Sequence, residues 1–222
     1  ALYRSPPSEQ LLAPLVPNYR DYSKEKPVSD QEFEAIRRAY AYEPRPLNAS
    51  VAVVEETEAY RHEIATFDAA YGNEKMIAHL FLPRRAKPPY QTVIYYGGGD
   101  SFRAAEFYPN AFYRCNAMFV IETGRAVVWP VYKGTFERGG GQQLTSLEER
   151  KQQCIQRSHD LRATIDYLFD RDDINRDKLA YFGSSSGANT GPILLAMEDR
   201  IATGILLNGG LAKGTGKLAP EM

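Results

Sequence analysis

The sequence predicts an α/β fold with a mostly parallel sheet and flanking helices. Between residues 92 and 210, short apolar runs alternate with stretches of helical periodicity, and strands that alternate with helices form βαβ units. Before them, residues 60–69 and 75–83 repeat with a period of two, which is typical of antiparallel strands joined by a turn. The sheet is expected to be truncated after its sixth strand.

The chain divides into an N-terminal segment and a core. Residues 1–58 are expected to form an arm and one short helix that pack on the core, which we place at residues 59–222. Residues 1–28 are rich in proline and poor in apolar pairs, and this composition favours an irregular arm.

A short helix is predicted at residues 30–42. Ser29 followed by Glu32 is a capping-box pattern. Phe33 and Ile36 recur at helical spacing, and the prolines that follow end the helix because proline lacks the backbone donor.

Six strands and two long helices are expected in the core. The helices are residues 145–170, with an apolar stripe along one face, and residues 187–199. A further loop and helix are expected between residues 107 and 124. The strands are residues 60–69, 75–83, 92–96, 126–132, 178–183 and 201–210.

The composition argues against several classes of partner. The net charge is -1, so no basic excess recommends a nucleic acid or an anionic membrane. No stretch approaches the roughly 20 apolar residues that cross a bilayer, and the start of the chain lacks the pattern of a signal peptide. Cys115 and Cys154 lack metal-ligand spacing, and we expect no metal and no cofactor.

The segment Gly183-Ser184-Ser185-Ser186-Gly187 matches the pattern Gly-x-Ser-x-Gly. It follows an apolar strand and opens an apolar helix, which is the setting of a nucleophile elbow. Small residues at both flanks let a sharp turn present the Ser185 hydroxyl, with the Ser186 amide facing a developing oxyanion. The alternative is a serine-rich loop that only caps a helix.

A glycine run, Gly97 to Gly99, follows the third expected strand. An oxyanion hole of this kind needs a second amide from the loop at that place, and glycine lets the backbone approach a ligand closely. We therefore expect Gly97 or Gly98 to be the second donor. A flexible turn or a phosphate-binding loop is the alternative, although the Lys-Ser/Thr ending of a P-loop is absent.

Two side chains are candidates for contact with substrate. Asp100 follows the glycine run and is expected to orient the oxyanion loop, or else to be a solvated turn residue. Tyr132 follows the fourth strand, at the carboxyl edge where ligands bind in parallel sheets. Its alternative is ordinary loop packing.

The segments that carry these motifs resemble the α/β-hydrolase superfamily. They are FGSSSGA after DINRDKLAY, YYGGGD after the third strand, and GRAVVWPVYKGTFERG. The chain is most similar to acyl esterases related to the acetyl xylan esterase, dienelactone hydrolase and prolyl-oligopeptidase groups. The order from VPNYRDYSKEKPVSDQEF onward resembles a subgroup fused to bacterial serine/threonine kinases, which suggests a domain outside the cytoplasm. The resemblance implies Ser185 as nucleophile and Ser186 as oxyanion donor.

The partners of the serine are expected outside this chain. In this fold the triad runs in the order serine, acid, histidine, and no further strand follows residue 210. His62, His79 and His159 all precede Ser185, and each is expected to be a surface or packing residue. A C-terminal remainder of the same protein is therefore expected to supply the acid and the base, and a remnant that does not turn over is the alternative.

The function expected from these residues is hydrolysis of a small-molecule carboxylic ester through an acyl-enzyme on Ser185. A peptidase or an acyltransferase on the same scaffold is one alternative. A non-catalytic, hydrolase-like binding module is another, and it would keep the pocket without the reactivity.

Overall fold

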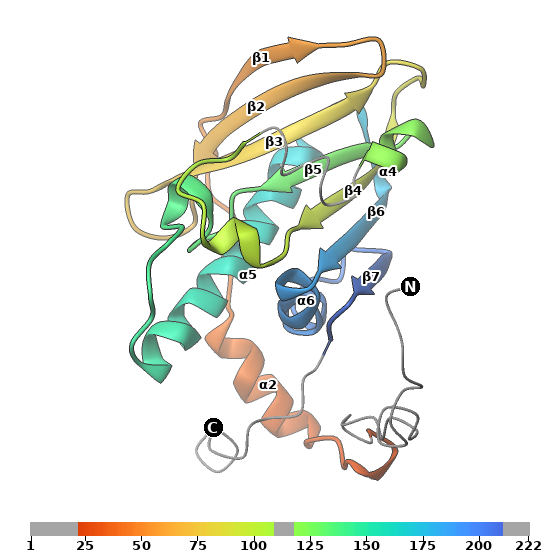
Figure 1. Ribbon diagram of the computed structural model, residues 1–222. Coiled ribbons are helices and arrows are strands. Elements are labelled where there is room, and N and C mark those ends of the chain that lie inside the picture. The colour runs from red at the N-terminus through yellow and green to blue at the C-terminus, as the bar shows by residue number, and fades with distance from the viewer. Residues whose placement is uncertain (1–21, 109–117, 211–222) are drawn as a thin grey trace, which may run out of the picture. The chain divides into compact units, whose positions relative to one another are not determined.

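The computed structural model describes residues 22–108 and 118–210 (Figure 1). Contacts group Val28–Leu211 into one compact unit. Within its described part, none of the helices is long and apolar enough to span a membrane. Nor do these residues contain a group of three or more side chains that could bind a metal ion.

The unit is built on a seven-stranded sheet in the order β1-β2-β3-β5-β4-β6-β7 (Figure 1). The first three strands and β5 pair in antiparallel fashion, whereas β5, β4, β6 and β7 are mutually parallel. The strands are β1 (Ser50–Glu56), β2 (Tyr60–Asp68), β3 (Lys75–Pro83), β4 (Tyr90–Tyr96), β5 (Ala126–Pro130), β6 (Ile174–Ser184) and β7 (Thr203–Leu207).

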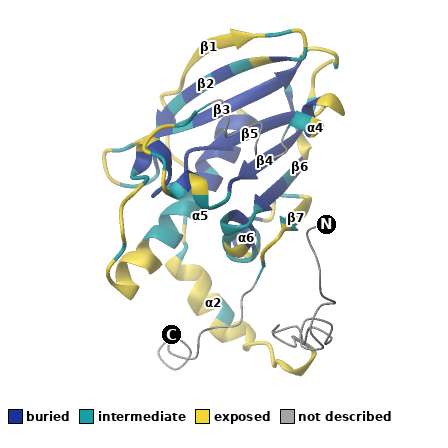
Figure 2. Cartoon of the chain, viewed as in Figure 1, coloured by how far each residue is buried: buried dark blue, intermediate teal, exposed yellow. Residues whose placement is uncertain are grey.

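Helices cover both faces of the sheet. The central strands are buried on both faces, so successive residues of β4 enter two different cores: Ile94 and Tyr96 pack on the face of α5 and α6, and Val93 and Tyr95 on the face of α4. Figure 2 shows the buried centre of the sheet between the exposed β1 and α2. The helices are α2 (Asp30–Ala39), α4 (Met118–Glu122), α5 (Leu147–Phe169) and α6 (Ser186–Ala196), with 3-10 turns η1 (Tyr22–Lys24), η2 (Gly99–Phe102) and η3 (Phe136–Arg138).

The predicted fold class and all six predicted strands are confirmed. The two long core helices are confirmed as α5 and α6, and the predicted capping box is present on α2, where the Ser29 side chain accepts from the amide of Glu32. That helix ends at Ala39, a few residues before the predicted end. Part of the helix predicted between residues 107 and 124 is α4, and residues 109–117, with Cys115, lie outside the described residues.

The sequence analysis did not predict strand β1, and it gave these residues to the N-terminal arm. All seven residues of β1 are exposed, so their pattern lacks the alternation of a half-buried strand. The strand forms because its backbone pairs with β2, and a β-bulge lies between Val53 and Glu55. Strand β1 therefore extends the sheet into the predicted arm.

A buried ion pair joins η3, α5 and the turn between β2 and β3. The Arg138 guanidinium lies 2.7 Å from the carboxylate of Asp160 on α5, and both side chains are almost fully buried. Tyr71, from the turn between β2 and β3, donates to Asp160 at 2.8 Å, and the amide of Lys133 donates at 2.7 Å. The loop after β5 is thereby fixed to α5 and to the β2–β3 turn.

The half-buried His62 on β2 and the buried His79 on β3 form a pair. His62 Nε2 lies 3.0 Å from His79 Nδ1, and the His79 ring stacks on Phe107 at 3.7 Å. Burial lowers the pKa of His62 to about 4 and that of His79 to about 3. Both rings are therefore neutral at pH 7, which fits the predicted packing role.

We predict that the protein loses stability between pH 6.5 and pH 5. The folded pKa of His79 lies below its unfolded value, so the unfolded chain binds more protons as the pH falls, and stability is complete only above about pH 6.5. The loss from His79 alone is about 2 kcal/mol at pH 5, since the slope is about 1.4 kcal/mol per pH unit. Urea unfolding at pH 7 and pH 5 measures it. His79→Gln should show a smaller pH dependence, and equal unfolding free energies at both pH values for the parent would contradict the prediction.

Candidate active site

Ser185 lies at the junction of β6 and α6 in a strained backbone conformation. Its φ of 50° and ψ of -106° fall outside the regions that L-residues favour. The strain is held by two hydrogen bonds: the Ser185 amide donates to Leu207 O at 2.8 Å, and the Asn189 amide donates to Ser185 O at 2.9 Å. Its side chain makes no helix-capping bond, although it is the N-cap of α6, so the hydroxyl is available for chemistry. Strained residues of this kind cluster at functional sites.

The flanking glycines make the turn possible. A Cβ on Gly183 would lie 2.5 Å from Gly187 O, and a Cβ on Gly187 would lie 2.2 Å from Tyr96 O. Both distances are shorter than any real contact of a methyl group with an oxygen. Gly187 therefore allows α6 to approach the end of β4, and Gly183 allows β6 to approach the start of α6.

The glycine run after β4 lies against the serine. A Cβ built on Gly98 would lie 3.5 Å from the Ser185 Cβ, and Gly97 O accepts the Gly187 amide at 3.1 Å. Within the described part of the chain, neither the Gly98 amide nor the Ser186 amide has a hydrogen-bond acceptor. The structure thus brings Ser185, Ser186, Gly97 and Gly98 together at the carboxyl edge of the sheet.

The two predicted substrate contacts have different outcomes. Asp100 is exposed on η2, directly after the glycine run, and forms a loose ion pair with Arg103 at 3.8 Å, so its predicted role stays a prediction. Tyr132 is fully buried, and its ring stacks on Tyr96 at 4.0 Å. A side chain that belongs to the core does not line a pocket, and we therefore correct the assignment of Tyr132 to a packing residue.

None of the three histidines hydrogen-bonds to Ser185 among the described residues. His62 and His79 bond each other, and β3 is three strand positions from β6, which corresponds to about 14 Å. His159 Nε2 lies 2.9 Å from Ala41 O, where the loop after α2 meets α5. Each histidine therefore has a structural place away from the serine.

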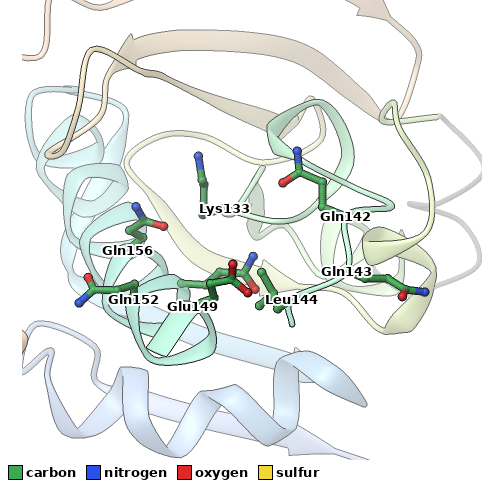
Figure 3. A pocket seen from close by; sticks show the side chains of 8 residues that line it. Lys133, Gln142, Gln143, Leu144, Glu149, Gln152 and Gln156 are labelled. Carbon is green, nitrogen blue, oxygen red and sulfur yellow. The ribbon is translucent and has the colours of Figure 1, made fainter. Parts of the chain in front are cut away.

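A polar groove that the sequence analysis did not predict lies beside this edge (Figure 3). Its two hollows, of about 430 and 460 Å³, share Gln142, Gln143, Leu144 and Gln153 in their walls. Further walls come from Phe102, Lys133, Gly134, Glu149, Arg150, Gln152, Gln156 and Arg157. No local sequence motif predicts the groove, because its walls come from a loop, a helix and η2.

The charged groups of the groove are mostly engaged with the protein. Lys133 Nζ lies 2.7 Å from Glu74, and Arg157 donates to Lys133 O at 2.9 Å. The Glu149 carboxylate accepts from the amides of Thr145 and Ser146, and these hydrogen bonds lower its pKa. Amide side chains remain: among the described residues, those of Gln142, Gln143 and Gln156 have no hydrogen-bond partner. They offer both donors and acceptors to a ligand.

No protein-family model and no curated protein sequence matches the chain. Several solved structures, in contrast, match its structure. A Bacteroides fragilis protein assigned as an acetyl xylan esterase has 15% identity and a TM-score of 0.62, and it is matched over 77% of this chain and 50% of its own. Acetyl xylan esterase 1 from Thermoanaerobacterium sp. has 12% identity and a TM-score of 0.60, over 81% and 58%. A glucuronoyl esterase from Solibacter usitatus has 16% identity and a TM-score of 0.54, over 83% and 58%.

The chain has the α/β-hydrolase fold. It spans about half the length of these solved structures. At such low identity the likeness concerns the fold alone. In this chain Ser185 directly follows the carboxyl end of β6.

We predict that Gly187→Ala destabilises the protein by more than about 3 kcal/mol, or prevents folding, because the new Cβ would meet Tyr96 O. Gly99→Ala is the matched control, since no atom lies within 4 Å of a Cβ built there, and its effect should stay within about 0.5 kcal/mol. Urea unfolding measures both. Similar unfolding free energies for the two variants would show that α6 and β4 are not in close contact.

Proposed function

We propose that the protein is a serine esterase that hydrolyses carboxylic esters through an acyl-enzyme on Ser185. The observation that carries this proposal is the strained Ser185 backbone at the strand-to-helix turn, with a hydroxyl that makes no cap. The esterase names of the solved structures with this fold agree with it. An N-cap serine in a purely structural loop would use its hydroxyl for capping and would not need a positive φ.

The proposed first step is attack of the Ser185 hydroxyl oxygen on the ester carbonyl, which forms a tetrahedral oxyanion. The amides of Ser186 and Gly98 are the proposed donors to that oxygen, since both lack acceptors within the described residues and both border Ser185. The alcohol then leaves with a proton, and water attacks the acyl-serine to release the acid and restore the hydroxyl.

The proposal requires a general base, because a serine hydroxyl is a weak nucleophile at neutral pH. We place the histidine and its acid outside these 222 residues, on a further part of the same polypeptide. The matched part of this chain covers only 50% and 58% of two solved structures with this fold. Strand β7, at the end of the sheet order, leaves Ile205 and Leu207 half exposed, and soluble proteins cover such apolar edges.

A non-catalytic binding module is the second candidate. The observation that favours it is the lack of any hydrogen bond between a histidine and Ser185 in the described residues. Such a module would retain the groove and the turn and would not react with a serine-directed phosphonate.

We predict that Ser185→Ala lowers the hydrolysis of p-nitrophenyl acetate by at least about 10³-fold, because the acyl-enzyme no longer forms. Ser184→Ala is the matched control, as the neighbouring serine on β6 does not occupy the turn. Initial rates and labelling by a fluorophosphonate measure the effect in the full-length polypeptide, which carries the proposed histidine, for the parent and both variants. A parent without turnover and without labelling supports the binding module, and equal rates for parent and Ser185→Ala exclude Ser185 as the nucleophile.

The groove is the proposed site for the alcohol part of the ester. It adjoins the oxyanion loop, because the Gly141 amide donates to Phe102 O at 2.6 Å and Phe102 ends η2. Its unpaired glutamine amides favour an alcohol that carries several hydroxyl groups. The name acetyl xylan esterase, borne by two of the solved structures, denotes an ester of a carbohydrate of that kind.

We predict that Gln142→Ala and Gln156→Ala each raise the KM for an acetylated oligosaccharide about 10-fold, since each removes one hydrogen-bonding group of about 1.4 kcal/mol. The change in kcat/KM for p-nitrophenyl acetate, whose alcohol has no such hydroxyl groups, should be much smaller. Gln31→Ala, on the exposed face of α2, is the control variant. Steady-state kinetics with both substrates decide the matter, and parallel changes for the two substrates would remove the groove from substrate binding.

A further inference from the structure

Ser101 lies in η2, three residues after Gly98, and only 3% of its surface is exposed. Its hydroxyl donates to Gly98 O at 2.6 Å, and its amide donates to the same oxygen at 3.1 Å. The Gly98 carbonyl is therefore held by two donors from one buried residue.

The peptide unit on the other side of Gly98 is also fixed. Gly97 O accepts the Gly187 amide at 3.1 Å, and the trans geometry of this peptide points the Gly98 N–H in the opposite direction. Hydrogen bonds therefore hold both the Gly97 carbonyl and the Gly98 carbonyl. The Gly98 amide has no acceptor among the described residues. Because glycine rotates freely at φ and ψ, only these anchors fix where that amide points.

The same local bond occurs elsewhere without a nearby nucleophile. Thr135 is 2% exposed, and its hydroxyl donates to Tyr132 O at 2.7 Å, again three residues back and next to a 3-10 turn. The bond from Thr135 to Tyr132 is therefore an example of a buried hydroxyl-to-carbonyl hydrogen bond with a purely structural role. Ser101 differs from it because the carbonyl that it holds belongs to Gly98, where an added Cβ would lie 3.5 Å from the Ser185 Cβ.

We propose that Ser101 is a positioning residue for the oxyanion hole: its hydroxyl holds the Gly98 carbonyl, and this anchor, together with the one on Gly97 O, fixes the Gly98 backbone so that its amide faces the oxygen of the tetrahedral intermediate. The inference rests on the proposed esterase function. Oxyanion donors contribute by being in place before charge develops, so a loosened donor lowers kcat and leaves ground-state binding nearly intact.

The test compares Ser101→Ala with Thr135→Val, two substitutions that remove the same kind of buried hydroxyl. Hydrolysis of p-nitrophenyl acetate and inhibition by a trifluoromethyl ketone, which mimics the tetrahedral intermediate, are measured for the parent and both variants. We expect Ser101→Ala to lower kcat about 10-fold, to change KM less than about twofold, and to weaken the inhibitor in proportion to kcat. Thr135→Val should match the parent in kcat, although both variants lose similar unfolding free energy.

Each outcome has a distinct meaning. An active parent with equal kcat for Ser101→Ala and Thr135→Val overturns the inference and leaves the esterase function standing. A full-length parent without turnover overturns the esterase function, and this inference falls with it. If Ser101→Ala does not fold, Ser101→Cys replaces it, because the thiol fills the site and is a weaker donor, and an unchanged kcat there would overturn the inference.

Discussion

The close contact between α6 and the end of β4 is the constraint on which the rest of the site depends. It exists because Gly187 carries no side chain to meet Tyr96 O, and Gly183 leaves similar room between β6 and the start of the helix. From this contact follow the strained Ser185 backbone, the hydrogen bond from the Gly187 amide to Gly97 O, and the position of Gly98 beside the serine. Strand β7 completes the arrangement, since Leu207 O accepts the Ser185 amide. The turn is thus over-determined by neighbours on both sides, and such over-determination is what allows a strained residue to persist.

The features predicted correctly from the sequence are those defined by residues close together in the chain. The buried strands, the capped helices and the Gly-x-Ser-x-Gly turn each depend on residues within a few positions of one another, so a pattern in the chain is sufficient to find them. Strand β1 escaped because both of its faces are exposed and only its pairing with β2 defines it. Tyr132 was wrongly assigned because the sequence shows that it follows a strand and does not show which way the chain then turns.

The groove and the buried ion pair were not predicted from the sequence, for a related reason. Arg138, Asp160 and Tyr71 come from three distant parts of the chain, and nothing in the neighbourhood of any one of them indicates the other two. The pair is almost fully desolvated, so loss of either partner would leave an uncompensated charge in the interior. Its arrangement ties the loop after β5 to α5, and this loop leads into the wall of the groove.

The groove and the elbow rest on different parts of the molecule. The elbow is held by β4, β6, β7 and α6, whereas the walls of the groove come mainly from residues 133–157, anchored through Arg138 and Asp160. They meet at η2, and among the described residues α5 also packs against α6. Under the proposed function, exchange of the groove glutamines would change which alcohol is recognised and would leave the proposed nucleophile in place.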